Sequence, residues 1–434
     1  MPKLKDAVLG SANGRFDVAT WEAIVIFFSQ RWWRQVWTIL ETKAVAEKLR
    51  IMYDNGLHDI LWCRLAVVVR VLLFFLPREG SVSAPEHALL CTLRNSLESF
   101  QALSILHNIN SCGHDGSCSP EGEYRAQDMR PLQDMKLLSL LQRFRNAQAM
   151  DPRDKVYALL AIANDTEAVN LDPNYSLTWQ QVYIRLAKYY IELQDCLSII
   201  TMSAFCPKTL EELPSWVPDW RFVSEANTLN SFPPEIPYNT CLFGKGEPRV
   251  SEDLKLLYVT GFRVDQIKVK RKISKKKRCT LHMWGPNAER EWKYIQRTWL
   301  QSCPPPYEPK VDLCWGTPVA YHDAPLNADK DPDAEDLGHA TRSRHSPFSD
   351  DGLLLQGRAF CTTVKGRTGL IPKEARVGDI ICILASLPVP VVLRHAGKRK
   401  WYLIGECYVT GIMDGEVLED LVEDEVRPRM FVLR

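Results

Sequence analysis

The sequence predicts a mixed α+β protein, with helices in its front and middle and a small antiparallel β-rich module at its C-terminal end. Apolar residues recur at spacings of three and four over residues 21–110, which indicates helices. From residue 253 the apolar period changes to two, which is typical of strands. Of the 434 residues, 46% are hydrophobic and 25% are charged, which excludes a disordered chain.

The helical part of the chain shows recognisable starts and one clear interruption. Residues 111–130 are rich in turn formers and predict a loop or insertion between residues 1–110 and a helical region over 131–252. A helix is predicted over Leu137–Met150. The next helix is expected to begin at Asp151 as N-cap, with Pro152 in the first turn and Asp154 near the positive helix end. A further helix should follow Ser176, with one buried face made of Val182, Tyr183, Leu186, Ala187 and Tyr190.

Two prolines exclude regular helix from residues 213–220, because each proline and the residue before it favour extended backbone. We predict a rigid strap that lays Trp216 and Trp220 onto a core.

The last third of the chain predicts short strands in a small antiparallel sheet or barrel. Residues 253–301 should hold strands and one amphipathic helix over Asn287–Gln301. Residues 302–352 should form a flexible linker, and residues 353–434 the β-rich module. The expected strands contain Leu257 to Val269, Leu353 to Phe360, Asp379 to Leu384, Val389 to Arg394 and Trp401 to Val409, with a turn at Gly378-Asp379.

Charge and cysteine content limit the classes of partner. Lys and Arg number 54 against 53 Asp and Glu, so any binding to nucleic acid or to a membrane must be local. Thirteen cysteines without a C-x-x-C pair predict reduced thiols in the cytosol or nucleus. The apolar stretch Leu65–Leu76 contains Arg70 and is too short to span a membrane, so a buried helix is expected, with Arg64 and Arg70 on its polar side.

Two local clusters leave alternatives open. His107, Cys112, His114 and Cys118 could bind zinc, but their spacing matches no standard site; we favour a polar loop and expect no metal. Lys268 to Arg278 holds eight basic residues in eleven, which suits a phosphate-contacting patch or a nuclear import signal. We favour a solvated hairpin loop, since no aromatic residue interleaves the run to stack bases.

Five segments between Arg31 and Glu416 resemble sequence blocks of the fungal heterokaryon incompatibility (HET) domain family. They are Arg31–Glu41, Asp151–Leu160, Pro173–Ser176, the tryptophan strap and Gly405–Glu416. The residues that match family motifs are Arg31, Trp33, Arg34, Trp37, Asp151, Pro152, Arg153, Asp154, Lys155, Tyr157, Trp216, Trp220, Gly405, Glu406, Tyr408, Gly411, Gly415 and Glu416. Leu40 departs from the pattern, because family members usually carry Gln there.

The resemblance implies a fold remotely related to Toll/interleukin receptor domains and a role in fungal non-self recognition and programmed cell death. Nothing like the usual opening strand, Y-x-A-L-S-Y-x-W-G, precedes Trp21, so we expect residues 1–110 to be a partial domain that lacks its front. Some Toll-like domains cleave NAD with a glutamate, and Glu41 is the matching acid here. It would lie at the edge of a helical stripe of Trp33, Val36, Trp37 and Leu40.

We favour a non-enzymatic protein that uses no cofactor and has protein partners. No membrane partner is expected and a nucleic-acid partner is disfavoured. The expected location is the cytoplasm, with nuclear import through Lys268 to Arg278 as the alternative. Two other functions stay open: an NAD-cleaving death effector that uses Glu41, and a protein- or nucleic-acid-binding module in the β-rich region.

Overall fold

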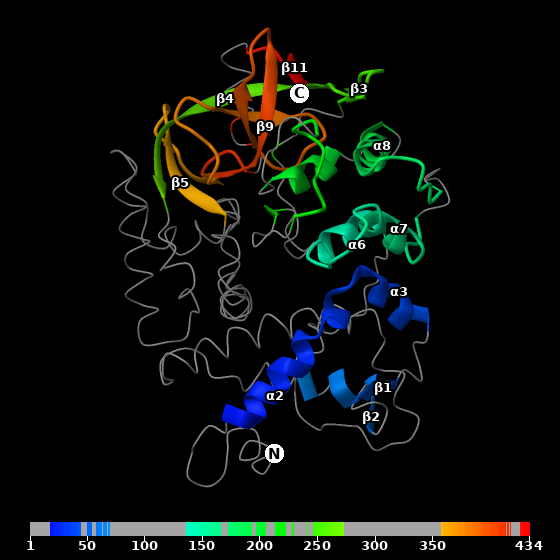
Figure 1. Ribbon diagram of the computed structural model, residues 1–434. Coiled ribbons are helices and arrows are strands. Elements are labelled where there is room, and N and C mark those ends of the chain that lie inside the picture. The colour runs from blue at the N-terminus through cyan, green and yellow to red at the C-terminus, as the bar shows by residue number, and fades with distance from the viewer. Residues whose placement is uncertain are drawn as a thin grey trace, which may run out of the picture. The chain divides into compact units, whose positions relative to one another are not determined.

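The computed structural model contains two compact units, Met1–Ser176 and Leu177–Arg434 (Figure 1). The structure describes residues 18–44, 50–53, 58–62, 64–66, 68–69, 136–165, 172–192, 197–204, 213–222, 228–229, 240, 246–272, 357–413, 415, 417 and 426–434. The predicted helix Asn287–Gln301, linker 302–352 and loop 111–130 lie outside these residues. No helix within the described ranges is long and apolar enough to cross a membrane.

The first unit combines short helices with one antiparallel hairpin. Its elements are α2 (Val18–Ser29), η1 (Arg31–Arg34), α3 (Val36–Ala44), β1 (Arg50–Tyr53), β2 (His58–Leu61), α6 (Leu137–Arg143) and α7 (Asp154–Leu160). The described residues between Trp62 and Val69 are also helical, with Leu65 and Val69 buried and Arg64 exposed as expected.

The hairpin adds strands to a stretch that the apolar spacing predicted to be rich in helices. Strand β1 pairs with β2 from Arg50 opposite Leu61 to Tyr53 opposite His58. Four-residue strands are too short to show a period of two in the sequence. The dipeptide Asn55-Gly56 between them is a hairpin signal that could have identified the pair.

The predicted continuous helix through Arg31–Glu41 is wrong, because the backbone becomes extended at Gln35 (φ −76°, ψ 136°) between η1 and α3. The extended backbone at Gln35 changes which side chains of α3 face the core. Val36 and Ile39 are therefore buried, whereas Trp37 is 38% exposed and Leu40 is half-buried. The predicted stripe holds for Trp33 and Val36 only.

The predicted bounds of the next two helices also need correction. Helix α6 ends at Arg143 rather than Met150. Helix α7 begins at Asp154, and Asp151 lies in a turn before it rather than at its N-cap. The carboxylate of Asp151 nevertheless accepts the backbone N–H of Arg153 at 3.0 Å, so it caps that turn. Within α7, Val156 and Tyr157 are buried, and Leu160 is half-buried.

The second unit joins helical segments to a curved sheet. Its elements are α8 (Trp179–Glu192), η5 (Leu197–Ser203), β3 (Arg249–Val250), β4 (Leu257–Lys272), β5 (Arg358–Thr363), β6 (Thr368–Pro372), β7 (Ile380–Leu384), β8 (Val391–His395), β9 (Lys400–Glu406), β10 (Tyr408–Val409) and β11 (Arg429–Leu433). Helix α8 starts with a reciprocal cap: Thr178 Oγ1 accepts the N–H of Gln181, whose side chain accepts the N–H of Thr178. All five residues of its predicted apolar face are buried, which confirms that prediction.

The sheet closes into a barrel-like ring, as the sequence predicted. Strand β4 is long and pairs with β7 and β5. The ring continues from β7 through β8 to β9, and from β5 through β6 to β10, all antiparallel. Strand β10 follows β9 after Cys407. The hydrogen-bonded circuit of β4, β7, β8 and β9 is closed by β11. Strand β11 packs antiparallel to β4 and parallel to β9 (Figure 1).

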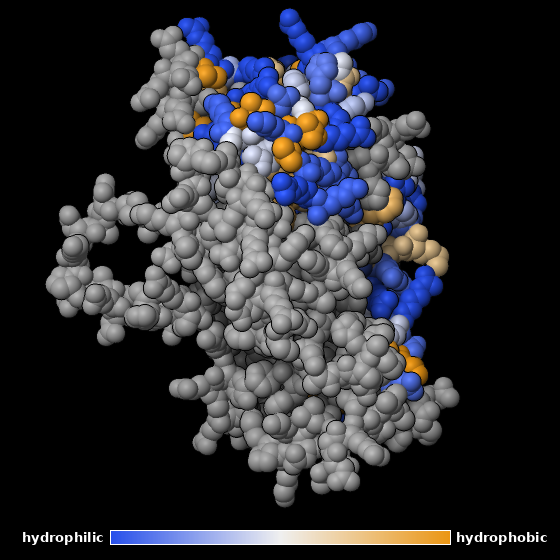
Figure 2. Space-filling model, turned by 90° about the vertical axis from the view of Figure 1, so that its left-hand side faces the viewer, coloured by the Kyte–Doolittle hydropathy of each residue, from blue (hydrophilic) through white to orange (hydrophobic). Residues whose placement is uncertain are grey.

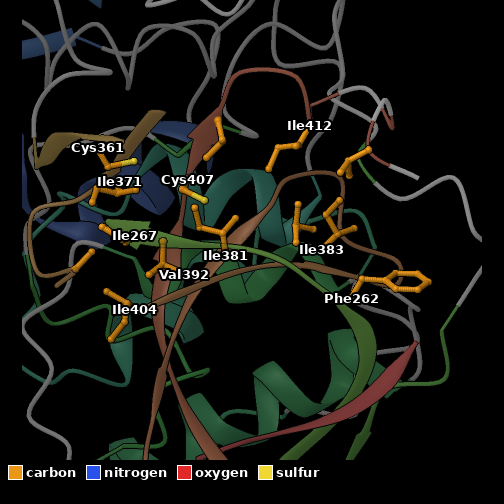
Figure 3. Packing of buried hydrophobic residues seen from close by; sticks show 14 of the residues in the cluster. Phe262, Ile267, Cys361, Ile371, Ile381, Ile383, Val392, Ile404, Cys407 and Ile412 are labelled. Carbon is orange, nitrogen blue, oxygen red and sulfur yellow. The ribbon is translucent and has the colours of Figure 1, made fainter. Parts of the chain in front are cut away.

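The barrel interior is filled by aliphatic residues and cysteines from seven strands. Figure 3 shows side chains from β4 to β10 converging there, with Cys361 and Cys407 among isoleucines. The predicted turn before β7 is confirmed: Gly378 has φ +91°, and the N–H of Asp379 donates to the carbonyl of Arg376. Strands β6 and β11 were not predicted.

Candidate functional sites

Three of the motif segments meet in the first unit around the carboxylate of Asp154. The indole N–H of Trp37 donates to one of its oxygens at 3.1 Å, and the hydroxyl of Tyr175 donates to the other at 2.8 Å. These groups come from residues 31–41, 151–160 and 173–176. The segments are therefore held together by contacts between residues up to 117 positions apart in the sequence. The three side chains form an aromatic–carboxylate cluster at the surface of this unit.

Arg153 also links the segments 151–160 and 173–176. Its guanidinium donates to both carboxylate oxygens of Asp151 and to the carbonyl of Tyr175 at 2.6 Å, and it lies 5.0 Å from the Tyr175 ring centre. The hydrogen bonds from Arg153 lower the pKa of Asp151. Burial, followed by the hydrogen bond to Asp154, raises the pKa of Tyr175 to about 12. The phenol therefore stays neutral and acts as a donor at physiological pH.

Lys155 has a structural position, although it is a motif residue. It is only 6% exposed, and its ammonium donates to the carbonyls of Arg145 and Ala147, which follow the end of α6. Burial lowers its pKa to about 8. Tyr157 is buried beside it and donates its hydroxyl to the carbonyl of Asn174 at 3.1 Å.

Glu41, the predicted catalytic acid, is exposed at the surface of α3. Its carboxylate accepts the indole N–H of Trp32 at 3.3 Å. Glu41 forms no ion pair within the described residues. Arg31 and Arg34 lie in η1, and Trp33 packs against the rings of Phe27 and Phe28. Trp33 therefore belongs to the core of this unit.

The tryptophan strap is irregular and buried, as predicted. Trp216 and Trp220 are 0% and 4% exposed, and Trp220 packs edge-to-face on Tyr183 of α8. Ser215 fixes the strap to the barrel, because its N–H donates to the carbonyl of Arg434 and its hydroxyl accepts the N–H of Leu403. These motif residues position the barrel against α8, which is a structural role.

The Gly405-Glu406 motif lies at the point where the barrel closes. Gly405 has φ +149°, and an added Cβ would lie 2.8 Å from the side chain of Ala204 and 3.0 Å from that of Pro372. Glu406 forms an ion pair with Arg358 at 2.6 Å, with both side chains 0% exposed, and also accepts the N–H of Leu229 at 2.5 Å. The burial of Arg358 could not be predicted, because no pattern in the neighbouring sequence indicates it.

The remaining motif residues are structural where they are described. Tyr408 is buried, and Gly411 and Gly415 have φ +73° and +89°, which favour glycine; Glu416 lies outside the described residues. Burial raises the pKa of Cys361 to about 12 and also raises the pKa values of Cys382 and Cys407, so these thiols are unreactive.

The two other clusters from the sequence lie wholly or partly outside the described residues. His107, Cys112, His114 and Cys118 lie outside them, and the described ranges contain no group that could hold a metal ion. Lys268 to Lys272 belong to strand β4 and pair with β5 rather than forming a hairpin loop, while residues 273–278 lie outside the described ranges.

Comparisons with known proteins agree with this architecture. Residues 320–427 match the model of the Het-6 beta-barrel domain. The chain is 22% identical over 467 aligned positions to "Heterokaryon incompatibility protein 6, OR allele" of Neurospora crassa, covering 91% of this chain and 65% of the relative. The chain thus spans about two thirds of the length of the curated relative it matches. No solved structure matches. The barrel match and the alignment over most of the chain together support a similarity to heterokaryon incompatibility proteins.

Proposed function

We propose that this protein acts in fungal heterokaryon incompatibility, as part of the non-self recognition that leads to death of fused cells of unlike genotype. The observation that carries the proposal is the barrel, whose strands β5 to β10 lie within residues 320–427, the segment that matches the Het-6 beta-barrel domain. The relative that aligns over most of the chain bears the name of a heterokaryon incompatibility protein. We place its action in the cytoplasm.

The N-terminal unit is proposed to be a HET domain that works through protein contacts. The packing of three motif segments around Asp154 supports this, because it gives the motif residues a shared structural purpose. Trp37 and Tyr175 remain 38% and 51% exposed while their polar atoms are fixed by Asp154. Rigid, exposed aromatic side chains are frequent anchors of protein interfaces.

We propose that the protein acts without enzymatic chemistry. A glutamate that stabilises positive charge on a ribose works best where water is excluded and the local dielectric is low. Glu41 is exposed to water, and its described partner is the neutral indole of Trp32. The buried carboxylate of Glu406 is already paired with Arg358 and the N–H of Leu229. These surroundings favour structural roles for both acids.

The test is a heterokaryon assay in a filamentous fungus. Strains that express the chain, strains that lack it and strains that express Trp37→Ala are each forced into heterokaryons with a panel of tester strains. The proposal predicts restricted growth and dye uptake by dying cells for at least one tester, only when the chain is present. The Trp37→Ala strain should show weaker incompatibility, with unchanged protein abundance. Normal growth with every tester would contradict the proposed function.

A further inference from the structure

Exposed basic residues lie along β4 from Arg263 to Lys272 and in two turns that flank Gln266. The N–H of Val364, in the β5–β6 turn, donates to the carbonyl of Gln266 on one edge of β4. The side chain of Gln266 donates to the carbonyl of Gly378, in the β6–β7 turn, on the other edge. The two turns therefore flank the same part of the strand. The exposed bases of this region, here called the basic end, are Arg263, Lys268, Arg271, Lys272, Lys365 and Arg376.

The acidic residues of this region are already neutralised by other bases. Asp265 is buried, accepts the N–H of Lys365 and faces Arg367 at 3.6 Å. Asp379 is held by two hydrogen bonds from Arg394. Glu374 pairs with its neighbour Lys373 at 3.7 Å. None of the six exposed bases has an ion-pair partner within the described part of the chain. Among the described residues, the basic end therefore carries a positive charge that no acidic side chain compensates, although the whole chain has a net charge of only +1.

Three exposed valines lie among these bases. Val269 follows Lys268 on β4 and is 40% exposed, while Val364 and Val377, in the two flanking turns, are 59% and 62% exposed. Each neighbours a basic residue in sequence: Lys268, Lys365 and Arg376 respectively. Figure 2, turned toward the side where Figure 1 draws β5, shows hydrophilic and apolar residues intermixed on the described upper part of this face.

We propose that the basic end of the barrel binds peripherally to the surface of an anionic phospholipid membrane. Lysine and arginine side chains near such a surface are attracted to the headgroup phosphates. Aliphatic side chains at turn tips gain free energy by leaving water for the boundary with the acyl chains. Lys270 fixes the arrangement, because its ammonium donates to the carbonyls of Lys373 and Ala375 and so holds the β6–β7 turn against β4.

The exposed valines favour a membrane over a nucleic acid. Single-stranded nucleic acid is bound by aromatic side chains that stack on bases, and the exposed residues of the basic end include none. Contacts with phosphates alone would make no use of the three valines. The sequence-based expectation of no membrane partner rested on spanning segments and on global charge, and it allowed local binding. The basic end is a local site of that kind.

The experiment is sedimentation of the full chain with phosphatidylcholine vesicles, with and without phosphatidylserine, at about 0.1 M salt, where the Debye length is about 10 Å. The wild type should sediment only with the anionic vesicles. At about 1 kcal/mol per base, the combined variant Lys268→Gln, Arg271→Gln and Lys272→Gln should bind roughly 100-fold more weakly.

A matched control removes three exposed bases from the opposite end of β4: Lys255→Gln, Lys398→Gln and Arg399→Gln. These residues precede the first residues of β4 and β9, which both lie beside the end of β11. This control should retain binding within about threefold of the wild type, since its charges would lie beyond a Debye length from the vesicle.

A second variant separates a membrane from a nucleic acid. Val364→Ser with Val377→Ser keeps every charge and alters only exposed side chains, so folding should be unaffected. It should weaken vesicle binding and leave any binding to a fluorescent oligonucleotide unchanged. The proposal is overturned if the wild type does not sediment with anionic vesicles, if both charge variants lose binding equally, or if the serine variant binds vesicles as tightly as the wild type.

Discussion

Replacing Glu406 with Gln tests the buried ion pair that joins β5 to β9. The substitution keeps the size of the side chain but removes the charge that faces Arg358 at 2.6 Å, where both groups are fully buried. The guanidinium is then left in a low-dielectric interior without its counter-charge. Removing one partner of a buried pair costs about 3–5 kcal/mol. In a unit of this size, about 2–4 °C is lost per kcal/mol, so the melting temperature should fall by roughly 10 °C.

Glu374→Gln is the matched control in the same barrel. Its partner Lys373 is 54% exposed and lies 3.7 Å away, so solvent screens the pair and the cost should stay below about 0.5 kcal/mol. Replacing both charges together, as Arg358→Met with Glu406→Leu, removes the desolvation penalty along with the attraction. The double variant should therefore be more stable than Glu406→Gln alone.

The assay measures unfolding in urea by the hydrogen exchange of peptides from β5 and β9. These peptides report on the second unit separately from the first. The expected result is a large loss of protection in Glu406→Gln and little change in Glu374→Gln. Equal stability of these two variants would show that the Glu406 charge contributes nothing to the closed barrel, and would refute the reasoning.

Three further variants test local features of the fold. Gly405→Ala should cost about 2–4 kcal/mol in thermal unfolding, because of its φ of +149° and the close contacts of the added methyl group. Gly397 has φ +78°, and an added Cβ would meet no atom within 4 Å, so Gly397→Ala should cost only about 1 kcal/mol. Equal costs for the two variants would show that the close contacts at Gly405 do not matter. Asp151→Ala should cost about 1 kcal/mol at pH 7. This difference in stability should shrink as pH falls through the lowered pKa of Asp151. A difference that persists at low pH would show that the charge of the carboxylate is not its source. The pKa of Lys155 falls to about 8 in the folded state, so the unfolded chain binds more protons between about pH 8 and 10.5. Relative to Lys155→Met, the wild type should therefore gain roughly 3 kcal/mol of stability across that range, and a constant difference would contradict the lowered pKa.

Elements with strong local signals were predicted well from the sequence. Helix α8 has a reciprocal cap and a regular apolar face, and β7 follows a glycine turn with a run of aliphatic residues. In both elements the local preference and the tertiary environment favour the same structure.

Elements that depend on distant contacts were not predicted. The break at Gln35 follows no proline or glycine; it occurs where Gln35 bridges to Gln148, a residue remote in sequence. Likewise, Arg358 is buried because it meets Glu406 across the closed barrel. The local sequence pattern predicts neither the break at Gln35 nor the burial of Arg358, since each depends on a residue that only the folded chain brings close.

The geometry of the candidate site could not be predicted from the sequence. The motif resemblance selected Trp37 and Asp154, which the structure joins by a hydrogen bond. It did not indicate that Tyr175 completes the cluster, because that contact depends on the path of the chain after α7. The catalytic role predicted for Glu41 remains a hypothesis, and its exposure motivates the final experiment.

The most direct test of the central claim measures cell death in incompatible fusions together with nicotinamide release by the purified chain. The wild type and Glu41→Ala are compared in both assays. A role in incompatibility without enzymatic chemistry predicts equal cell death for the two proteins and no nicotinamide release from NAD by either. Release of nicotinamide by the wild type that disappears in Glu41→Ala, together with loss of cell death, would contradict the account and make Glu41 catalytic.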